Sequence, residues 1–180
     1  MITDIKLDEK IDIFCELLLS YNKVHNISGV KSKEDIVKYI KDSIYPVKFL
    51  KNHQNILDIG SGAGFPGLII ALFYPEKKVT LLEPIKKKSS FLHLAKSRLE
   101  LKNVTVLSKR VEECEVFFVD LIVSRAVTDT NVLLKLSKNF LNKKTKLLLY
   151  KGSSVTKELD NIKYDMIQNN NRRYIYIKGV

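Results

Sequence analysis

Residues 55–67 read Asn55-Ile56-Leu57-Asp58-Ile59-Gly60-Ser61-Gly62-Ala63-Gly64-Phe65-Pro66-Gly67. The first five residues predict a short buried strand, because strands covered on both faces are rich in apolar residues. Alternate glycines follow, and glycine allows backbone conformations and close approaches that other residues resist. Proline suits the first turn of a helix. This stretch therefore predicts a strand, a glycine loop and a helix, as in an α/β fold.

The same alternation continues toward the C-terminus. Apolar runs predict further strands at 79–83, 104–107, 121–124 and 146–150, with a terminal antiparallel pair at 164–168 and 173–178. Helical spacing of apolar residues lies between them, and Thr130 is expected to be the N-cap of one helix. We therefore expect a Rossmann-like α/β fold whose mostly parallel seven-stranded sheet is covered on both faces.

The first fifty residues predict helices packed on that sheet. Apolar residues recur at helical spacing in two stripes: Ile11, Phe14, Cys15, Leu18 and Leu19, then Ile36, Val37, Ile40, Ile44 and Val47. Residues 21–29 contain asparagine, serine and glycine and are expected to form a loop between the two helices. No linker-like composition separates the parts. Residues 1–180 are therefore expected to be one domain, with 1–50 as a helical extension and 51–180 as the Rossmann-like core.

Composition limits the function classes. The chain is 45% hydrophobic and 28% charged over 180 residues, which is typical of globular proteins. No apolar run approaches the ~20 residues of a membrane span, and the acidic start does not resemble a secretory signal. Cys15 and Cys114 give neither a metal-ligand spacing nor a disulfide framework. We expect a cytoplasmic protein without a metal site or a stable protein partner.

The net charge indicates a polyanionic partner. Thirty-one Lys and Arg against twenty Asp and Glu give +11, which favours nucleic acid. A surface that simply uses lysine heavily is the alternative interpretation, so the charge permits a nucleic-acid partner without establishing one.

The glycine loop has the features of a cofactor site. In open α/β sheets, ligands bind beyond the carboxyl ends of the strands, and a helix N-terminus favours a carboxylate or phosphate. Glu83 ends the next strand, nineteen residues after Gly64, where a carboxylate can accept hydrogen bonds from ribose hydroxyls. Asp58 followed by Gly60, Gly62 and Gly64 is the spacing common in S-adenosylmethionine-dependent methyltransferases. We therefore expect S-adenosyl-L-methionine as the cofactor.

Other interpretations of the loop compete. Residues 62–67 also match the dinucleotide pattern G-x-G-x-x-G, which would make the chain a nicotinamide-dependent oxidoreductase with Glu83 on the ribose. That reaction needs an acid–base group, and no histidine stands in a suitable place. Glycines that serve only a tight turn would not explain Asp58 and Glu83 together. A methyltransferase acting on a small molecule or a protein stays open.

The residues after the fourth strand narrow the methyl acceptor. Methylation of pyrimidine C5 needs an attacking thiolate, and neither Cys15 nor Cys114 follows that strand. Enzymes for exocyclic amino groups typically carry an Asn/Asp-Pro-Pro-aromatic motif, where this chain has Ser124-Arg125-Ala126-Val127. Guanine N7 has its own lone pair, so the protein need only align the reactants and exclude water. A site with Arg125 and no obvious general base agrees with such an acceptor.

Six motifs carry a more specific resemblance: Leu18–Ile27, Lys41–Ile44, Asp58–Gly67, Arg110–Glu113, Ser124–Ala126 and Lys151–Gly152. Through them the chain resembles the bacterial 16S rRNA guanine-N7 methyltransferase family (RsmG, formerly GidB) over nearly its whole length. The resemblance implies a class I methyltransferase fold and an enzyme that methylates guanine N7 in the decoding-region loop of small-subunit rRNA. Its partner would be 16S rRNA or the small ribosomal subunit particle.

The resemblance also implies site residues. Cofactor contacts carry over to Gly60, Phe65, Val111, Glu112 and Arg125, with Val111 and Glu112 near the adenine and Phe65 packed on the cofactor. Two departures stand out: Tyr39 replaces the usual histidine before the Asp-Ser pair, and Lys87-Lys88 replaces a typical Lys-Arg. Lysine lacks the bidentate phosphate geometry of arginine.

Several polar residues are candidates for RNA contact or catalysis. Arg125 and Lys151 at strand ends are the candidate catalytic residues; Lys151 is also expected, with Lys87 and Lys88, to meet phosphates. A solvated helix start is an equally good interpretation of the lysines at 86–88. Asn22 and Asn26 suit either substrate contact or structural capping. His53 is expected at the surface without a partner, and His93 is expected to be partly buried.

Overall fold

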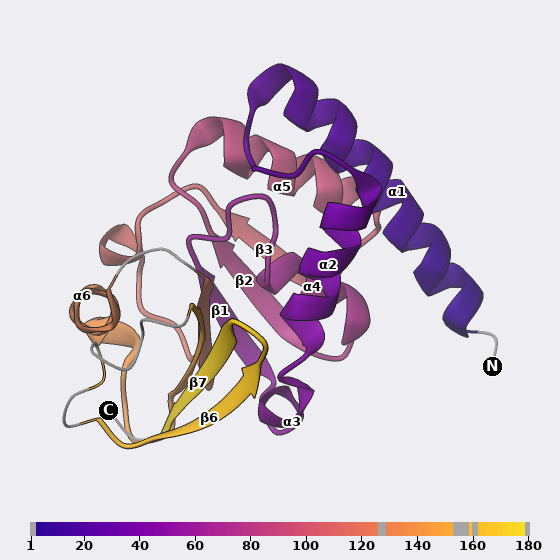
Figure 1. The fold of residues 1–180 in the computed structure, drawn as a ribbon. Coiled ribbons are helices and arrows are strands. Elements are labelled where there is room, and N and C mark those ends of the chain that lie inside the picture. Colours follow the sequence, from indigo (N-terminus) through magenta and orange to yellow (C-terminus); the bar gives the residue numbers. More distant parts are fainter. Residues whose placement is uncertain (1–2, 126–128, 153–158, 160–161, 179–180) are drawn as a thin grey trace.

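The computed structural model describes residues 3–125, 129–152, 159 and 162–178 (Figure 1). Seven strands form one sheet in the order β3-β2-β1-β4-β5-β7-β6. They are β1 (Asn55–Ile59), β2 (Lys78–Leu82), β3 (Val104–Leu107), β4 (Leu121–Arg125), β5 (Lys146–Lys151), β6 (Tyr164–Asn169) and β7 (Arg172–Lys178). Strands β1 to β5 are parallel, and β7 pairs antiparallel with β5 and with β6. Every strand lies within one residue of its expected range, which confirms the Rossmann-like sheet.

Strand β1 is the centre of this topology. It pairs in parallel with β2 on one side and with β4 on the other, so the chain leaves it in opposite directions. Such a reversal opens a crevice at the carboxyl ends of the central strands. Four of the five β1 residues are buried, as expected for a strand covered on both faces.

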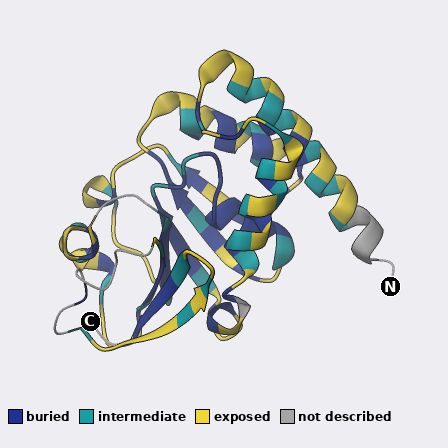
Figure 2. Cartoon of the chain, in the orientation of Figure 1, coloured by how far each residue is buried: buried dark blue, intermediate teal, exposed yellow. Residues whose placement is uncertain are grey.

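Helices cover the two faces of the sheet unequally. The helices are α1 (Thr3–His25), α2 (Lys33–Ile44), α3 (Val47–Leu50), α4 (Gly67–Phe73), α5 (Lys86–Arg98) and α6 (Thr130–Leu136), with short 3-10 turns η1 (Val111–Glu113) and η2 (Lys138–Phe140). Helices α1 to α5 share one buried cluster on one face, while α6, η1 and η2 contribute to a second cluster on the other. Figure 2 shows the buried residues concentrated on the strands and the facing sides of the helices.

The N-terminal helices pack directly on the core. Helix α1 lies against α5, and α2 lies against α4 (Figure 1). Phe14 is fully buried and meets the ring of Phe65 edge-on at 5.6 Å, and Cys15 is buried as the apolar stripe predicts. The sequence predicts a loop at residues 21–29, but residues 21–25 are helical. Helix α1 continues to His25 because Tyr21 packs on Phe91 at 5.3 Å and donates a hydrogen bond to the Lys87 carbonyl.

Two other local predictions are corrected. Asp129, not Thr130, is the N-cap of α6, since its carboxylate accepts from the Asn131 backbone N–H at 2.8 Å. Thr130 is instead the first helical residue and is fully buried. His93 is exposed on α5, where partial burial was expected.

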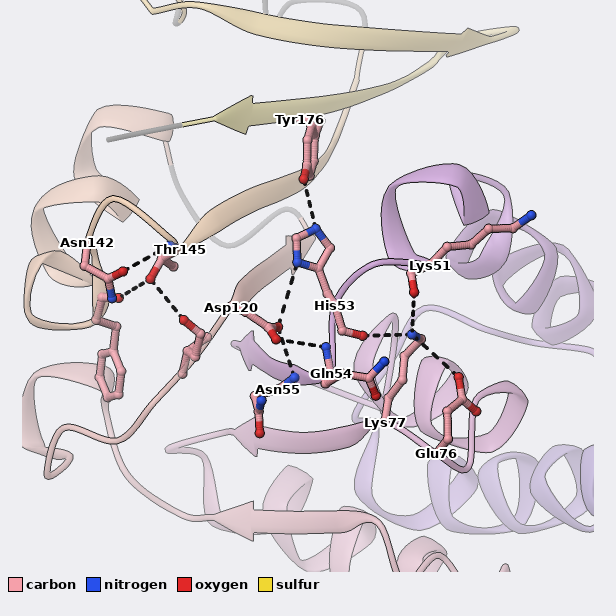
Figure 3. A network of polar contacts seen from close by, with 12 residues as sticks. Lys51, His53, Gln54, Asn55, Glu76, Lys77, Asp120, Asn142, Thr145 and Tyr176 are labelled. Atoms are coloured by element: carbon pink, nitrogen blue, oxygen red, sulfur yellow. Dashed lines mark hydrogen bonds and ion pairs between the residues drawn. The ribbon is translucent and has the colours of Figure 1, made fainter.

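His53 is buried, contrary to the expectation that it is a surface residue without a partner. Its Nε2 lies 2.9 Å from the Tyr176 hydroxyl and its Nδ1 lies 3.8 Å from Asp120 (Figure 3). Burial lowers the pKa of the imidazole. The neighbouring Lys77 is 1% exposed and donates to the His53 carbonyl at 2.8 Å. This network ties the amino ends of the central strands together, away from the crevice.

Among the described residues, no helix is both long and apolar enough to cross a membrane.

Packing at the start of α4 gives a testable consequence. A Cβ at Gly67 would lie 2.6 Å from both Asp58 Cβ and Leu81 Cδ2, and it would also clash with the Asp58 carboxylate. We therefore expect Gly67→Ala to lower the free energy of unfolding by about 1–3 kcal/mol, measured by urea denaturation. Gly29→Ala is the matched control, because a Cβ there meets nothing within 4 Å. Equal stability of the two variants would contradict this packing.

Candidate active site

The glycine loop adopts a backbone conformation that residues other than glycine disfavour. Gly60, Gly62 and Gly64 have φ angles of 73°, 57° and 94°, all in the left-handed region that side chains disfavour. The backbone N–H groups of Gly60 and Ser61 donate to the Leu82 carbonyl at 2.9 and 3.0 Å. The alternate glycines thus let the chain turn sharply at the end of β1 while staying bound to the end of β2.

Asp58 closes this loop from within the core. Its side chain is fully buried, and Oδ2 accepts a hydrogen bond from the Gly67 N–H at 2.9 Å. Burial raises the pKa of the carboxyl to about 7, against the hydrogen bonds from Gly67 and Ser61 and the charge of Arg125, which lower it. Asp58 is not among the residues that line the cleft described below, so its role is to hold the two ends of the loop together.

Glu83 positions the middle of the loop. Its side chain is almost buried; Oε2 accepts from the Gly62 N–H at 2.8 Å and Oε1 from the Ile85 N–H at 2.9 Å. Each carboxylate oxygen can accept more than one hydrogen bond. Glu83 lines the cleft as well, so it can shape the loop and still accept from a bound hydroxyl.

A cleft of about 500 Å³ opens at the carboxyl ends of β1, β2 and β4. Of the residues expected from the sequence, it is lined by Gly60, Gly62, Phe65, Glu83, Lys88, Val111, Glu112 and Arg125. Leu82, Pro84 and Ile85 add an apolar wall beside Val111. Gly64 is not among the lining residues and serves the turn instead. Ser28 and Gly29, between α1 and α2, close one side of the cleft, so the N-terminal helices contribute to it.

Arg125 is the main cation inside the cleft. Its guanidinium lies between two rings, 4.6 Å from the centroid of Tyr39 and 4.9 Å from that of Phe65. Nη1 stands 3.5 Å from the Asp42 carboxylate and, although buried, has no hydrogen-bond partner in the described structure. Burial lowers the pKa of this guanidinium, while Asp42 opposes the shift. A buried cationic donor without a partner at the wall of a cleft fits an anionic ligand group, such as the carboxylate of an amino acid.

Comparison with known proteins now identifies the family. The family profile described as GidB, rRNA small subunit methyltransferase G, matches residues 7–178. Ribosomal RNA small subunit methyltransferase G of Aliarcobacter butzleri is 43% identical over 178 residues, 97% of this chain and 92% of the relative. The protein of the same name from Wolinella succinogenes is 39% identical, over 98% of this chain and 92% of the relative. The chain belongs to this family.

Solved structures agree on the fold. A crystal structure of MtNAS in complex with MTA and tNA matches with a TM-score of 0.65 at 9% identity, over 96% of this chain and 74% of that one. The ribosomal protein L11 methylase of Lactobacillus delbrueckii subsp. bulgaricus matches with a TM-score of 0.62 at 11% identity, over 79% and 78%. Identities this low support the fold alone. Family and fold together confirm the predicted class I methyltransferase, with S-adenosylmethionine as its cofactor.

The site of this family member includes residues to which the sequence assigned no role. Tyr39, noted only as a departure from the family pattern, covers one face of the Arg125 guanidinium. Asp42, part of the motif at 41–44, supplies the carboxylate next to it. Their spacing of three residues places both on one face of α2, which is the signal that could have indicated them. Lys109 and Arg110, exposed residues that line the cleft, were also missed.

The RNA-contact candidates fall into two groups. Asn22 is used within the chain: its amide donates to the Ser28 and Val30 carbonyls, and its Oδ1 accepts from two backbone N–H groups. Lys87 also bonds internally, with Nζ donating to the His25 carbonyl at 2.9 Å. These contacts favour structural roles for both residues.

The remaining candidates stay near the cleft or at the surface. Lys88 lines the cleft, and Asn26 is exposed at a φ of 46°. Lys151 ends β5 and is partly exposed. Ala126 and Val127 lie outside the described residues. Within the described part of the chain, no His, Cys, Asp and Glu cluster could hold a metal ion.

The buried carboxyl of Asp58 gives the stability a pH dependence with a definite sign. Its folded-state pKa of about 7 lies above the model-compound value of 3.8, so the folded protein binds this proton more tightly than the unfolded chain. The resulting stabilisation is fully present below pH ~3.8 and is lost as the pH rises through about 7.

Asp58→Asn is neutral at every pH and should remove this dependence. The unfolding free energy of the wild type minus that of Asp58→Asn, measured in urea, is therefore expected to fall by a few kcal/mol between about pH 4 and pH 8. A difference that is constant over this range would contradict the raised pKa.

Proposed function

We propose that this chain transfers a methyl group from S-adenosylmethionine to N7 of a guanine in the decoding-region loop of 16S rRNA. The observation that carries the proposal is family membership over residues 7–178, combined with the nature of the cleft. Of its lining carboxylates, Glu83 is engaged by two backbone N–H groups, and Glu112 is exposed on η1. A cleft without a histidine lining and with an arginine on its wall suits an acceptor that needs no general base.

Different lining residues would contact different parts of the cofactor. Leu82, Pro84, Ile85 and Val111 would face the adenine, with Glu112 at its edge. The Glu83 carboxylate would accept from the ribose hydroxyls, and the unpartnered Nη1 of Arg125 would donate to the carboxylate of the methionine part. Phe65 would pack beside that part while it covers the guanidinium. When bound, the cofactor would supply an electrophilic methyl group for the lone pair of guanine N7 to attack, with S-adenosylhomocysteine as the leaving group.

The protein's contribution to rate would come from positioning. The loop is fixed by Asp58 and Glu83, and Arg125 is held between two rings with Asp42 at its edge, so the groups around the cleft need little reorganisation when substrate binds. Residues 27–30 cover one side of the cleft and would exclude water from the reacting atoms.

RNA would approach along the basic rim of the cleft. Lys88, Lys109 and Arg110 line it, and Lys151 stands at the end of β5. Phosphate contacts from such residues fix the register of a nucleic acid, and the net charge of +11 adds a general attraction. We further propose that Lys109 and Arg110, rather than Lys87 and Asn22, carry much of this contact, since the latter two bond within the chain.

We also propose that the whole chain forms one domain. Residues of α1, α2, α4 and α5 share one buried cluster with the sheet, which supports a single domain over residues 1–180 with a helical extension at 1–50. We propose that this domain acts as a monomer in the cytoplasm, where its ribosomal substrate is assembled.

Mapping the product tests the reaction. Small-subunit particles lacking the modification and naked 16S rRNA would each be incubated with the chain and labelled cofactor, and the methylated nucleoside would be located by mass spectrometry. We expect 7-methylguanosine at one position of the decoding region. A methyl group on another atom, or transfer only to protein or small molecules, would overturn the proposed function.

The basic rim has its own test. We expect Lys109→Ala with Arg110→Ala to raise the KM for rRNA substrate and to make the dependence of log KM on log salt shallower by roughly 0.7 per lost phosphate contact. Lys143→Ala with Lys144→Ala is the control of equal charge, because these exposed lysines lie in the turn before β5, at the amino ends of the strands. Identical salt dependence in both double variants would exclude a phosphate role for the rim.

A further inference from the structure

We propose that Asp42 is a positioning residue: it orients Arg125 so that one guanidinium N–H group faces the cofactor carboxylate. Asp42 lies on α2, outside the set of residues that line the cleft. The inference rests on the proposed function only in taking the carboxylate of S-adenosylmethionine as the partner of Arg125.

Asp42 is the meeting point of three elements. Its Oδ2 lies 3.1 Å from Nη2 of Arg172 and 3.5 Å from Nη1 of Arg125, and its Oδ1 accepts from the Tyr174 hydroxyl at 2.8 Å. Arg172 and Tyr174 belong to β7, while Arg125 ends β4. The Asp42 side chain is only 11% exposed, so these charges interact with little screening by water. A residue of the helical extension thus joins the C-terminal hairpin to the cleft.

Arg172 and Tyr174 contact Asp42 differently from Arg125. Arg172 and Tyr174 make hydrogen bonds to Asp42, which fix the carboxylate from the side of β7. Arg125 lies at ion-pair distance without a hydrogen bond, and its Nη1 has no hydrogen-bond partner. Asp42 therefore attracts the guanidinium electrostatically and leaves the nearby Nη1 donor without a hydrogen-bond acceptor in the described structure.

The rings of Tyr39 and Phe65 cannot orient the Arg125 donors by themselves. Tyr39 and Phe65 flank the Arg125 guanidinium at 4.6 and 4.9 Å and so restrict the plane in which it lies. Stacking does not select a rotation within that plane, whereas a charge at one edge does. Asp42 supplies that charge, so the direction of the Arg125 donors depends on it.

The charge balance also suits an anionic ligand. Two arginines share one carboxylate, which leaves one positive charge among the three groups; the Arg125 side chain is 14% exposed and that of Arg172 is 34% exposed. Removal of Asp42 would leave Arg125 and Arg172 facing each other without a counter-charge, and each would be free to turn toward solvent. The carboxylate thus keeps Arg125 in place while leaving a net charge for the cofactor.

Helix α2 does not depend on Asp42 alone. The adjacent Ser43 is fully buried, and its carbonyl accepts a hydrogen bond from the Tyr150 hydroxyl at 2.6 Å. Tyr45 also stacks on Tyr174 with a centroid distance of 5.4 Å. The C-terminal end of α2 is therefore anchored on β5 and β7 by other contacts, which makes Asp42 suitable for substitution.

The experiment is a comparison of affinities for S-adenosylhomocysteine by calorimetry, without RNA. We expect Asp42→Asn to weaken binding about tenfold, because Arg125 loses the charge that orients it. Asp12→Asn is the matched control: it removes an exposed carboxylate paired with Lys33 at 2.7 Å on another surface, and its affinity should equal that of the wild type. Thermal denaturation of each variant gives the range in which it is folded. A folded Asp42→Asn protein with wild-type affinity would overturn the proposal.

A double-mutant cycle separates positioning from a general structural effect. In the Arg125→Met background, Asp42→Asn should cause no further loss of affinity, since Asp42 acts through Arg125. Additive losses would show that Asp42 acts by another route and would also overturn the proposal.

A milder variant covers the case in which Asp42→Asn does not fold. Tyr174→Phe keeps the ring contacts with Tyr45 and Tyr150 and removes only the hydroxyl that fixes Asp42. We expect it to weaken binding about threefold, within the range of one hydrogen bond, and unchanged binding would count against the proposal. These measurements do not involve RNA, so a different methylated atom would refute the proposed function and leave this result standing.

Discussion

The site depends on one buried hydrogen bond, from the Gly67 N–H to the Asp58 carboxylate at 2.9 Å. It joins the end of β1 to the start of α4 across nine residues and leaves no room for a side chain at position 67. The intervening glycines must then take left-handed conformations. In that shape, the loop presents Gly62 to Glu83 and brings Phe65 against Arg125. A constraint inside the core thus fixes the geometry of the cleft.

Much of this arrangement could be predicted from the sequence, because it depends on local patterns. The strand ranges follow from apolar runs, and the loop follows from the spacing of its glycines, since both properties belong to consecutive residues. The cofactor contacts predicted from family resemblance at Phe65, Val111 and Arg125 all line the cleft. What the sequence alone could not supply was the surroundings of those residues.

Several of the predictions that failed concern contacts between distant segments, whereas the N-cap of α6 was misplaced by one residue within a local pattern. His53 was expected at the surface because its partners, Asp120 and Tyr176, are far away in the sequence. Helix α1 extends past the expected loop start because Tyr21 packs on a helix some seventy residues later. Asn22 and Lys87 looked available to RNA until their internal acceptors were known. Tertiary packing decides such cases, and one sequence shows no sign of it.

The N-terminal helices belong to the candidate site as well as to the fold. Tyr39 and Asp42 on α2 surround Arg125, and residues between α1 and α2 line the cleft. Tyrosine at position 39, where the family usually has histidine, keeps an aromatic face over the guanidinium and adds no second titrating cation beside it. In this chain the departure from the family pattern places a tyrosine ring 4.6 Å from the Arg125 guanidinium.

We infer that the cleft between the glycine loop and Arg125 holds S-adenosylmethionine. A crystal structure of the chain with S-adenosylhomocysteine would test this inference. We expect the amino-acid carboxylate within hydrogen-bond distance of the Arg125 guanidinium, the ribose hydroxyls on Glu83 and the adenine against Val111. A ligand that binds elsewhere, or one whose carboxylate does not approach Arg125, would contradict it.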